Sequence, residues 1–423
     1  MLSLNTKRYF SKELIQPLVL ALLFLSPPYL GCLIAPHLKI LLGLETFLAP
    51  LSMLACLLVK AKQRVFFGFC VGLGLFYWCA LSFRYNDYPF FMPLIIILVA
   101  LCYAGVFYLV LYQQFLFYRV VTLWLTSYIH PFGFDWLVPD AFFAYSLFKV
   151  DKLHFLMILI ALALYVYKNP LVKPFYMKSL ASLILLFCLE YPHTSAPLKG
   201  IKPIRTHVNQ ENKWQHPIFE NHIHYNLEQI QQAIKEHQKI VILPETAFSI
   251  ALNQSNLLHT LIQLGQQITI ITGALYKENH TIYNSTYIFH DNTYNYAHKV
   301  ILAPFGETMP FPKFIADYLD RFFFGSEVFS LGSAPNFTDF NLNGFAFRPL
   351  VCYEGTSQRA YTNSPPHLIV VSNNAWFVPS IEPFLQRMLL KYYARRFSKT
   401  IIHSVNKSPV YILSPTLLGD QNF

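Results

Sequence analysis

The spacing of apolar residues divides the chain into two parts. Up to about residue 192, long apolar runs alternate with short breaks that carry charged side chains. A helix needs roughly 20 apolar residues to cross the hydrocarbon core of a bilayer. No A-x-A-like cleavage site follows the first run, so we expect that run to stay in the protein as an anchor. We predict a membrane domain over residues 1–192 with about seven spans, at residues 14–33, 40–59, 65–83, 90–117, 120–138, 153–167 and 174–189.

Residues 199–423 show a different pattern. Short β-rich runs, several of them apolar on both faces, alternate with stretches that carry an apolar stripe at helical spacing. This alternation is typical of a single α/β domain with a buried sheet. We expect strands at residues 239–243, 268–272, 281–289, 346–352 and 368–372, and helices at residues 225–238 and 382–397.

Composition and charge favour a membrane protein over a nucleic-acid-binding protein. Charged residues make up 13% of the chain, against roughly 25% in a soluble domain. The formal net charge is +10, but residues 1–192 carry 14 basic and 7 acidic side chains, whereas the rest carries 18 and 15. With a cytoplasmic N-terminus, nine basic residues fall in inside segments and four in outside loops, which predicts that the second domain lies outside. We expect no nucleic-acid partner.

Cysteine usage points to one position. Six of the seven cysteines lie in or next to apolar runs, where a thiol behaves as a small hydrophobic group. Cys352 is the only cysteine after residue 192, and it directly follows a predicted strand. Such a cysteine is either a core residue or a nucleophile. The sequence has no CxxC and no HExxH motif, so we expect no metal and no cofactor.

Three segments of the second domain place a chemically useful side chain beside a predicted strand. They carry Glu245 in ILPETAF, Lys299 in HKVILAPFGE and Cys352 in PLVCYEG. A carboxylate can take the thiol proton, the thiolate can attack a carbonyl, and an ammonium can stabilise the resulting oxyanion. Taken singly, Glu245 after Pro244 fits a helix start and Lys299 fits a solvated side chain. Together, the three residues could form an acyl-transfer centre with these divided roles.

The contexts of these residues resemble the nitrilase superfamily. Glu, Lys and Cys occur in that order in PE-x-A, K-x-x-L-x-PFGE-x-x-P and CYE, and SNNAWF follows at residues 372–377. With the multi-span part attached, the chain resembles the membrane-anchored apolipoprotein N-acyltransferase family. The chain departs from the family pattern at Lys407, where members tend to have glycine, and at residues 411–418, which are too short for a final span.

This resemblance implies a fold, a set of site residues and a reaction. The implied fold is a multi-span helical domain followed by an αββα sandwich over residues 199–423. The site residues it implies are catalytic Glu245, Lys299 and Cys352, supporting Glu307, Tyr353 and Glu354, and substrate-binding Trp214, Trp376 and Asn373. The implied protein lies in the bacterial inner membrane, with its catalytic domain on the periplasmic face. The aromatic-rich residues 309–329 are a candidate lid, although ordinary core packing also explains them.

In the implied reaction, Cys352 takes an acyl chain from a phospholipid, with phosphatidylethanolamine as the expected donor. The thioester then acylates the α-amine of the N-terminal S-diacylglyceryl-cysteine of a lipoprotein. One alternative is a membrane-tethered nitrilase-type amidase that acts on a small C–N substrate. Another is a non-enzymatic transporter or scaffold with a degenerate nitrilase domain, which the presence of all three reactive residues argues against.

Overall fold

The computed structural model describes residues 2–85, 89–167, 173–213, 218–309 and 331–423, together with residues 312, 314, 315 and 318. Contacts between residues divide the chain into two compact units. Each unit includes one segment whose neighbours in the sequence belong to the other unit. The first unit comprises Met1–His130, Leu137–Thr194 and Phe377–Tyr392, and the second comprises Pro131–Trp136, Ser195–Trp376 and Tyr393–Phe423. The domain limits expected from the sequence, 1–192 and 199–423, stay a prediction.

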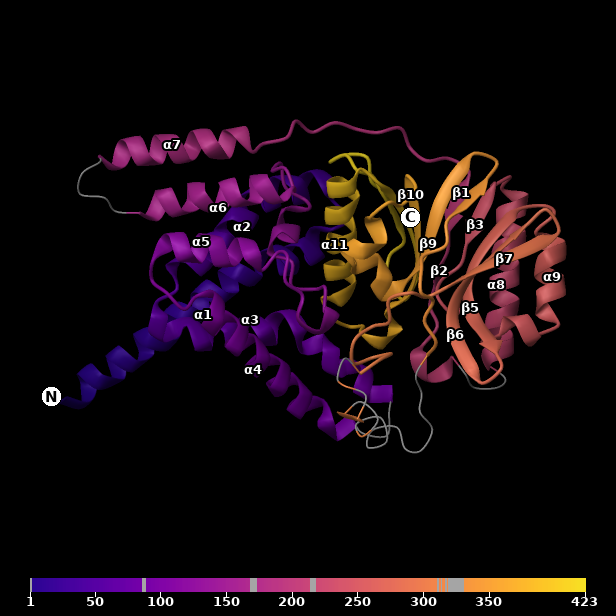
Figure 1. Cartoon of the computed structure of the whole chain (residues 1–423), viewed down its shortest axis with the longest axis horizontal. Coiled ribbons are helices and arrows are strands. Elements are labelled where there is room, and N and C mark those ends of the chain that lie inside the picture. Colours follow the sequence, from indigo (N-terminus) through magenta and orange to yellow (C-terminus); the bar gives the residue numbers. More distant parts are fainter. Residues whose placement is uncertain are drawn as a thin grey trace. The chain divides into compact units, whose positions relative to one another are not determined.

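Seven α-helices precede residue 190 in the described part of the chain (Figure 1). They are α1 (Leu2–Ile34), α2 (Leu38–Leu58), α3 (Arg64–Phe76), α4 (Met92–Val110), α5 (Leu116–Leu125), α6 (Lys152–Val166) and α7 (Pro174–Phe187). Within the described residues, four stretches are long and apolar enough to cross a membrane: Glu13–Ile34, Leu38–Leu58, Ala61–Tyr85 and Pro89–Val110. Helices α5, α6 and α7 are apolar but shorter, and the number of spans stays a prediction.

The expected span at residues 120–138 is not a continuous helix. Helix α5 ends at Leu125, and short 3-10 helices follow at Pro131–Gly133 and Pro139–Phe143. Proline lacks the backbone N–H that a helix interior requires, and Gly133 adopts a positive φ of 72°. The run is therefore interrupted by breaks in the helical backbone, which a hydropathy pattern does not record.

Helices α3 and α4 approach each other closely because α3 carries two glycines four residues apart. A Cβ atom on Gly68 would lie 2.8 Å from the Tyr103 carbonyl oxygen, and one on Gly72 would lie 2.5 Å from the Tyr103 Cβ. Small residues at this spacing let two membrane helices pack backbone to backbone. The Phe76 ring stacks on Tyr103 with its centroid 4.5 Å away.

The second unit contains two sheets (Figure 1). The first has the order β1-β3-β5-β6-β7, with β4 beside β5, and the second has the order β13-β12-β11-β10-β9-β8, with β2 beside β11. The first sheet is built from β1 (Ile201–Pro203), β3 (Ile240–Ile242), β4 (Phe248–Ala251), β5 (Thr269–Glu278), β6 (Thr281–His290) and β7 (Thr293–His298). The second is built from β2 (Arg205–Thr206), β8 (Phe340–Leu342), β9 (Phe345–Val351), β10 (His367–Asn373), β11 (Thr400–Asn406), β12 (Tyr411–Leu413) and β13 (Gln421–Asn422).

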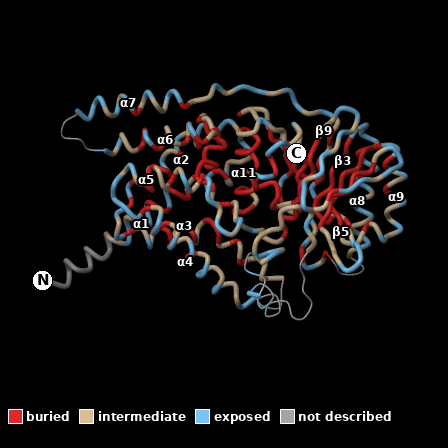
Figure 2. The backbone as a smooth tube through the Cα atoms, viewed as in Figure 1, coloured by how far each residue is buried: buried red, intermediate tan, exposed pale blue. Residues whose placement is uncertain are grey.

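The two sheets pack face to face through an apolar core. Ile242 and Ile271 of the first sheet share this core with Ile369 and Ile402 of the second. The central strands are buried along most of their length (Figure 2), as the apolar runs within them predict. In β10, Leu368 points to the opposite face from Ile369 and is also fully buried. The second sheet is therefore covered on both faces.

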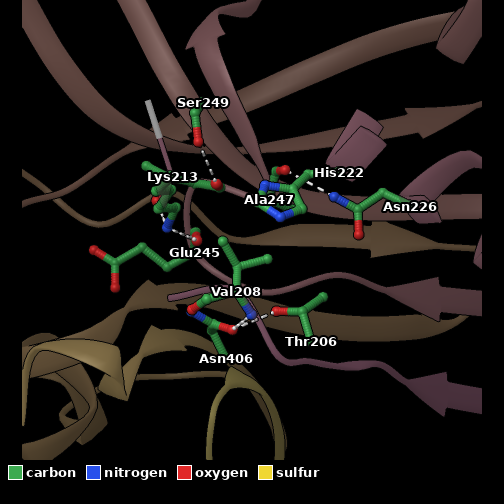
Figure 3. Close-up of a pocket in the computed structure, with 10 residues that line it drawn as sticks. Thr206, Val208, Lys213, His222, Asn226, Glu245, Ala247, Ser249 and Asn406 are labelled. Atoms are coloured by element: carbon green, nitrogen blue, oxygen red, sulfur yellow. Dashed lines mark hydrogen bonds between the residues drawn. The ribbon is translucent and has the colours of Figure 1, made fainter. Parts of the chain in front are cut away.

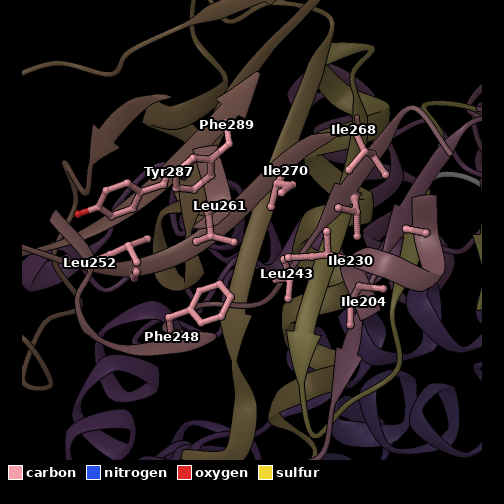
Figure 4. Close-up of a cluster of buried hydrophobic side chains, with 13 residues drawn as sticks. Ile204, Ile230, Leu243, Phe248, Leu252, Leu261, Ile268, Ile270, Tyr287 and Phe289 are labelled. Atoms are coloured by element: carbon pink, nitrogen blue, oxygen red, sulfur yellow. The ribbon is translucent and has the colours of Figure 1, made fainter. Parts of the chain in front are cut away.

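Helices cover the outer face of the first sheet. Ile230 of α8 (Ile218–Lys235) and Leu261 of α9 (Leu257–Leu264) pack against Ile270 and Phe289 of the sheet (Figure 4). On the other side of the unit, Tyr393 of α11 (Glu382–Phe397) stacks on Tyr361, with ring centroids 4.7 Å apart. These helices and sheets confirm the predicted fold class, a helical membrane part followed by an α/β sandwich.

Replacing Ile369 by alanine should destabilise the sandwich. The side chain is fully buried between the sheets, and a buried Ile→Ala change costs about 2–5 kcal/mol. Thermal unfolding of the purified protein in detergent measures the effect. The matched control is Ile282→Ala, on the half-buried part of β6, which should shift the midpoint much less. Equal shifts would contradict the assignment of the inter-sheet core.

Candidate active site

The three reactive residues expected from the sequence all follow strands. Glu245 comes after β3, Lys299 directly follows β7, and Cys352 directly follows β9. The negative charges of Glu245 and of a Cys352 thiolate both lie within range to act on the Lys299 ammonium. The two sheets therefore bring these residues, which are far apart in the sequence, into one local site.

Cys352 occupies a sharp turn from a strand into a helix. Its φ is +52°, in the left-handed region that costs a non-glycine residue roughly 1–2 kcal/mol. Strand β9 ends at Val351, and a 3-10 helix runs from Cys352 to Thr356. A nucleophile at such a turn projects from the sheet instead of lying within it, and Cys352 is half-buried here. Strain of this kind persists only where the surroundings hold it in place.

Glu354 holds that turn by accepting three backbone N–H groups. Its Oε2 accepts from Val351 at 2.7 Å, and its Oε1 accepts from Val300 at 2.5 Å and from Ile301 at 3.0 Å. The carboxylate thus joins the end of β9 to the segment after Lys299. Burial raises the pKa of Glu354 to about 7, while the Lys299 charge and the three N–H donors act in the opposite direction.

Lys299 forms a buried ion pair with Glu307. Lys299 is 1% exposed, and its Nζ lies 2.7 Å from the Glu307 Oε2. The same oxygen accepts the Ala303 N–H at 2.7 Å, which fixes the carboxylate. Burial alone would lower the pKa of Lys299, but the carboxylates of Glu307, Glu245 and Glu354 raise it above its usual value. The lysine therefore stays charged at neutral pH and can stabilise an oxyanion.

Glu245 is held by an asparagine that the sequence did not single out. The Asn284 Nδ2 donates to the Glu245 Oε1 at 2.7 Å, and both residues are buried. Asn284 lies on β6, opposite Leu275 of β5. The sequence carried little signal, because Asn284 is one of several polar residues in β6 and nothing in the strand indicates its partner.

Lys213 is a second cation at the site and was also missed. Its Nζ donates to the Glu245 carbonyl oxygen at 3.2 Å and to the Thr246 hydroxyl. Figure 3 shows Lys213 in a pocket that His222 and Asn226 also line. Burial lowers the pKa of Lys213 to about 8, although the charges of Glu245 and Cys352 oppose this. The only sequence signal was that Lys213 directly precedes Trp214.

Tyr353 contacts a segment from the N-terminal part of the sequence. Its hydroxyl donates to the Gly133 carbonyl oxygen and accepts the Asp135 N–H at 2.8 Å. Gly133 and Asp135 belong to the segment Pro131–Trp136, which is part of the second unit. The residue next to Cys352 therefore anchors a loop that comes from between α5 and α6.

Of the predicted substrate-binding residues, Asn373 lies in a buried chain of amides. Its Nδ2 donates to the Gln210 Oε1 at 2.8 Å, and its Oδ1 accepts from the Asn406 Nδ2 at 2.8 Å. Trp376 ends the 3-10 helix Asn374–Trp376 and is half-buried. The substrate-binding roles of both residues stay predictions.

Some predicted positions lie outside the described residues. They are Trp214 and, in the candidate lid, Phe311, Phe322, Phe323 and Phe324. Phe314 of the lid is described and is 75% exposed. Among the residues that the structure describes, no group of three or more His, Cys, Asp or Glu side chains is placed to hold a metal ion.

The chain is similar to curated proteins along nearly its whole length. Residues 11–191 match a family model described as the apolipoprotein N-acyltransferase integral membrane domain. The apolipoprotein N-acyltransferase of Helicobacter pylori is 45% identical over 413 residues, covering 95% of this chain and 96% of that protein. The protein of the same name from Wolinella succinogenes is 42% identical and covers 88% and 90%.

Solved structures align with about half of the chain. The alignment with a CN-hydrolase superfamily protein from Xanthomonas campestris covers 53% of this chain and 85% of that protein, with 15% identity and a TM-score of 0.40. The alignment with an amidase from Nesterenkonia covers 55% of this chain and 91% of the amidase, with 11% identity and a TM-score of 0.39.

Changing Glu354 to glutamine should destabilise the protein and lower its activity. All three partners of this carboxylate are N–H donors, so the amide group would place an NH2 against one of them. An unsatisfied buried donor costs about 1–3 kcal/mol. Thermal unfolding in detergent tests this, with Glu236→Gln as the control because Glu236 lies in an exposed ion pair with Lys202. No difference between the two variants would contradict the role assigned to Glu354.

Tyr353→Phe should loosen the segment 131–136 while leaving the rest of the fold intact. The change removes one hydroxyl that both donates and accepts, with an expected loss of about 1–2 kcal/mol. Hydrogen–deuterium exchange followed by peptide mass spectrometry should show faster exchange in this segment. Unchanged exchange there would mean that the hydroxyl does not anchor the loop.

Proposed function

The chain belongs to the apolipoprotein N-acyltransferase family, and from this premise we propose that Cys352, Glu245 and Lys299 transfer an acyl chain through a thioester. The protein is a bacterial membrane enzyme whose partners are lipids and lipoproteins. The observation that carries the proposal is the buried, charged Lys299 with Glu245 and Cys352 in electrostatic range.

In the first step, Glu245 takes the thiol proton of Cys352, and the thiolate attacks the ester carbonyl of a phospholipid. The tetrahedral oxyanion lies against the Lys299 ammonium, an interaction worth about 3–4 kcal/mol in comparable sites. The ester C–O bond then breaks, and the leaving oxygen receives the proton from Glu245. The products are a lysophospholipid and an acyl-Cys352 thioester. We propose phosphatidylethanolamine as the donor.

In the second step, the α-amine of the acceptor attacks the thioester. Glu245 takes a proton from the incoming amine, and Lys299 stabilises the second oxyanion. The C–S bond breaks, an amide forms, and the proton returns to the Cys352 sulfur. We propose that the acceptor is the N-terminal S-diacylglyceryl-cysteine of a lipoprotein. Both substrates are anchored in a membrane, which accounts for the helical domain attached to this site.

The surrounding residues support the three that react. Glu307 keeps Lys299 charged and in place, and Glu354 fixes the turn that carries Cys352. Trp214, Trp376 and Asn373 are proposed to contact substrate. We propose the inner membrane as the location, with the catalytic domain on the periplasmic face.

A membrane-tethered amidase acting on a small C–N substrate would use the same three residues. The curated relatives argue against it, because those that match both the membrane domain and the sandwich are named apolipoprotein N-acyltransferases. The N-acyltransferase function is therefore favoured.

Incubation of the purified protein with phosphatidylethanolamine, without acceptor, tests the first step. Intact-protein mass spectrometry should show a mass gain of one acyl chain, removed by hydroxylamine and absent from Cys352→Ala. A matched control is Cys188→Ala, whose thiol lies after α7 and should leave the adduct unchanged. A diacylated lipopeptide should then discharge the thioester. A folded protein that forms no adduct with phospholipid would contradict the proposed donor step.

A further inference from the structure

The backbone turn that carries Glu245 is strained and tightly enclosed. Thr246 has a φ of +44°, which is unfavourable for a β-branched residue. On one side, Gly273 of β5 approaches so closely that a Cβ on it would lie 2.6 Å from the Glu245 Cα. The Ala247 N–H donates to the Gly273 carbonyl oxygen at 3.0 Å. Strand β5 therefore supports one side of the turn.

Lys213 supports the same turn through its side chain. Its ammonium donates to the Glu245 carbonyl oxygen at 3.2 Å (Figure 3). It also donates to the Thr246 hydroxyl. These two acceptors belong to the general base and to the strained residue after it. A single side chain thus holds both residues of the turn.

The burial of Lys213 is unfavourable for stability alone. The residue is 4% exposed, and the described part of the chain gives it no salt bridge with a carboxylate. Removing an ammonium from water without an ion pair costs several kcal/mol, so an apolar residue would stabilise this position better. A lysine at this position therefore points to a role in the reaction.

Extending the function proposed above, we propose that Lys213 is a positioning residue that holds the Glu245–Thr246 turn and so keeps the Glu245 carboxylate aligned for proton transfer with Cys352. The Asn284 Nδ2 fixes the carboxylate end of Glu245 at 2.7 Å, and Lys213 fixes its backbone end. Loss of either support would let the base move, and a displacement of about 1 Å costs roughly 100-fold in rate.

The charge of Lys213 gives this role a pH dependence. The titratable groups that act on it are Glu245 and Cys352, and His222 lies close enough for Lys213 to act on it in turn. Burial lowers the pKa of Lys213 to about 8, against the opposing charges of Glu245 and Cys352. The ammonium is present below that pH and is lost above it. Acyl transfer should therefore fall on the alkaline side with a midpoint near pH 8.

The test compares Lys213→Met, Lys213→Arg and the control Lys202→Met, which changes a lysine paired with Glu236 on the surface of the same unit. Steady-state acyl transfer to a diacylated lipopeptide should show kcat lowered about 100-fold in Lys213→Met, with KM within about threefold of wild type. Lys213→Arg should recover to within about tenfold and should move the alkaline limb above pH 8, because a guanidinium stays charged.

A second measurement needs no lipid. Alkylation of Cys352 by iodoacetamide, followed at the peptide level by mass spectrometry between pH 6 and pH 9, should be slower in Lys213→Met than in Lys202→Met, because a displaced Glu245 takes the thiol proton less readily.

Equal kcat values and equal alkylation rates in Lys213→Met and Lys202→Met would overturn the proposal. Where Lys213→Met does not fold, Lys213→Arg decides, since an alkaline limb that stays near pH 8 in this variant would also overturn it. A wild-type protein that forms no acyl adduct would contradict the proposed function. The alkylation rates would still test the role of Lys213.

Discussion

The site depends on one constraint: a buried ammonium must be neutralised where it lies. Lys299 is removed from water, and its partner Glu307 is itself fixed by a backbone N–H. Separating two such groups leaves an unpaired buried charge, which is far less favourable than the pair. The loop from Lys299 to Glu307 is therefore held closed, and the adjoining N–H groups of Val300 and Ile301 are directed to Glu354. Through that carboxylate the constraint extends to the turn that carries Cys352.

Part of the sandwich could be predicted, because several of its central strands carry apolar runs that are buried on both faces. All five expected strands occur, as β3, β5, β6, β9 and β10, and the helix expected at residues 382–397 coincides with α11. Strand β7 was missed because its sequence, TYNYAH, has no continuous apolar run and follows a tight hairpin from β6. The expected span at 120–138 failed for a different reason, since hydropathy records apolar content and not the backbone breaks imposed by proline and glycine.

Site residues could be predicted where a local sequence motif marks them. They could not be predicted where only the folding of the chain brings them together. Glu245, Lys299 and Cys352 stand in recognisable motifs, whereas Asn284 reaches Glu245 only because β6 pairs with β5. Lys407, in contrast, is a position where the sequence departs from a recognisable family motif. It keeps the left-handed backbone that glycine favours, with a φ of +74°, and its N–H donates to the Thr206 carbonyl oxygen at 2.8 Å. The hydrogen bond offsets part of the strain that a lysine meets in this conformation.

The exchange of segments between the two units has a consequence for anyone who wishes to shorten this protein. Helix α11 begins in the first unit and ends in the second, and Arg387 near its start bonds the Tyr145 hydroxyl of the first unit at 2.9 Å. A soluble fragment that starts after the membrane helices would expose that half of α11 and would lack the loop Pro131–Trp136 that Tyr353 binds. Excision of a catalytic module therefore requires a redesigned helix surface and a grafted loop, and a single cut in the gene does not suffice.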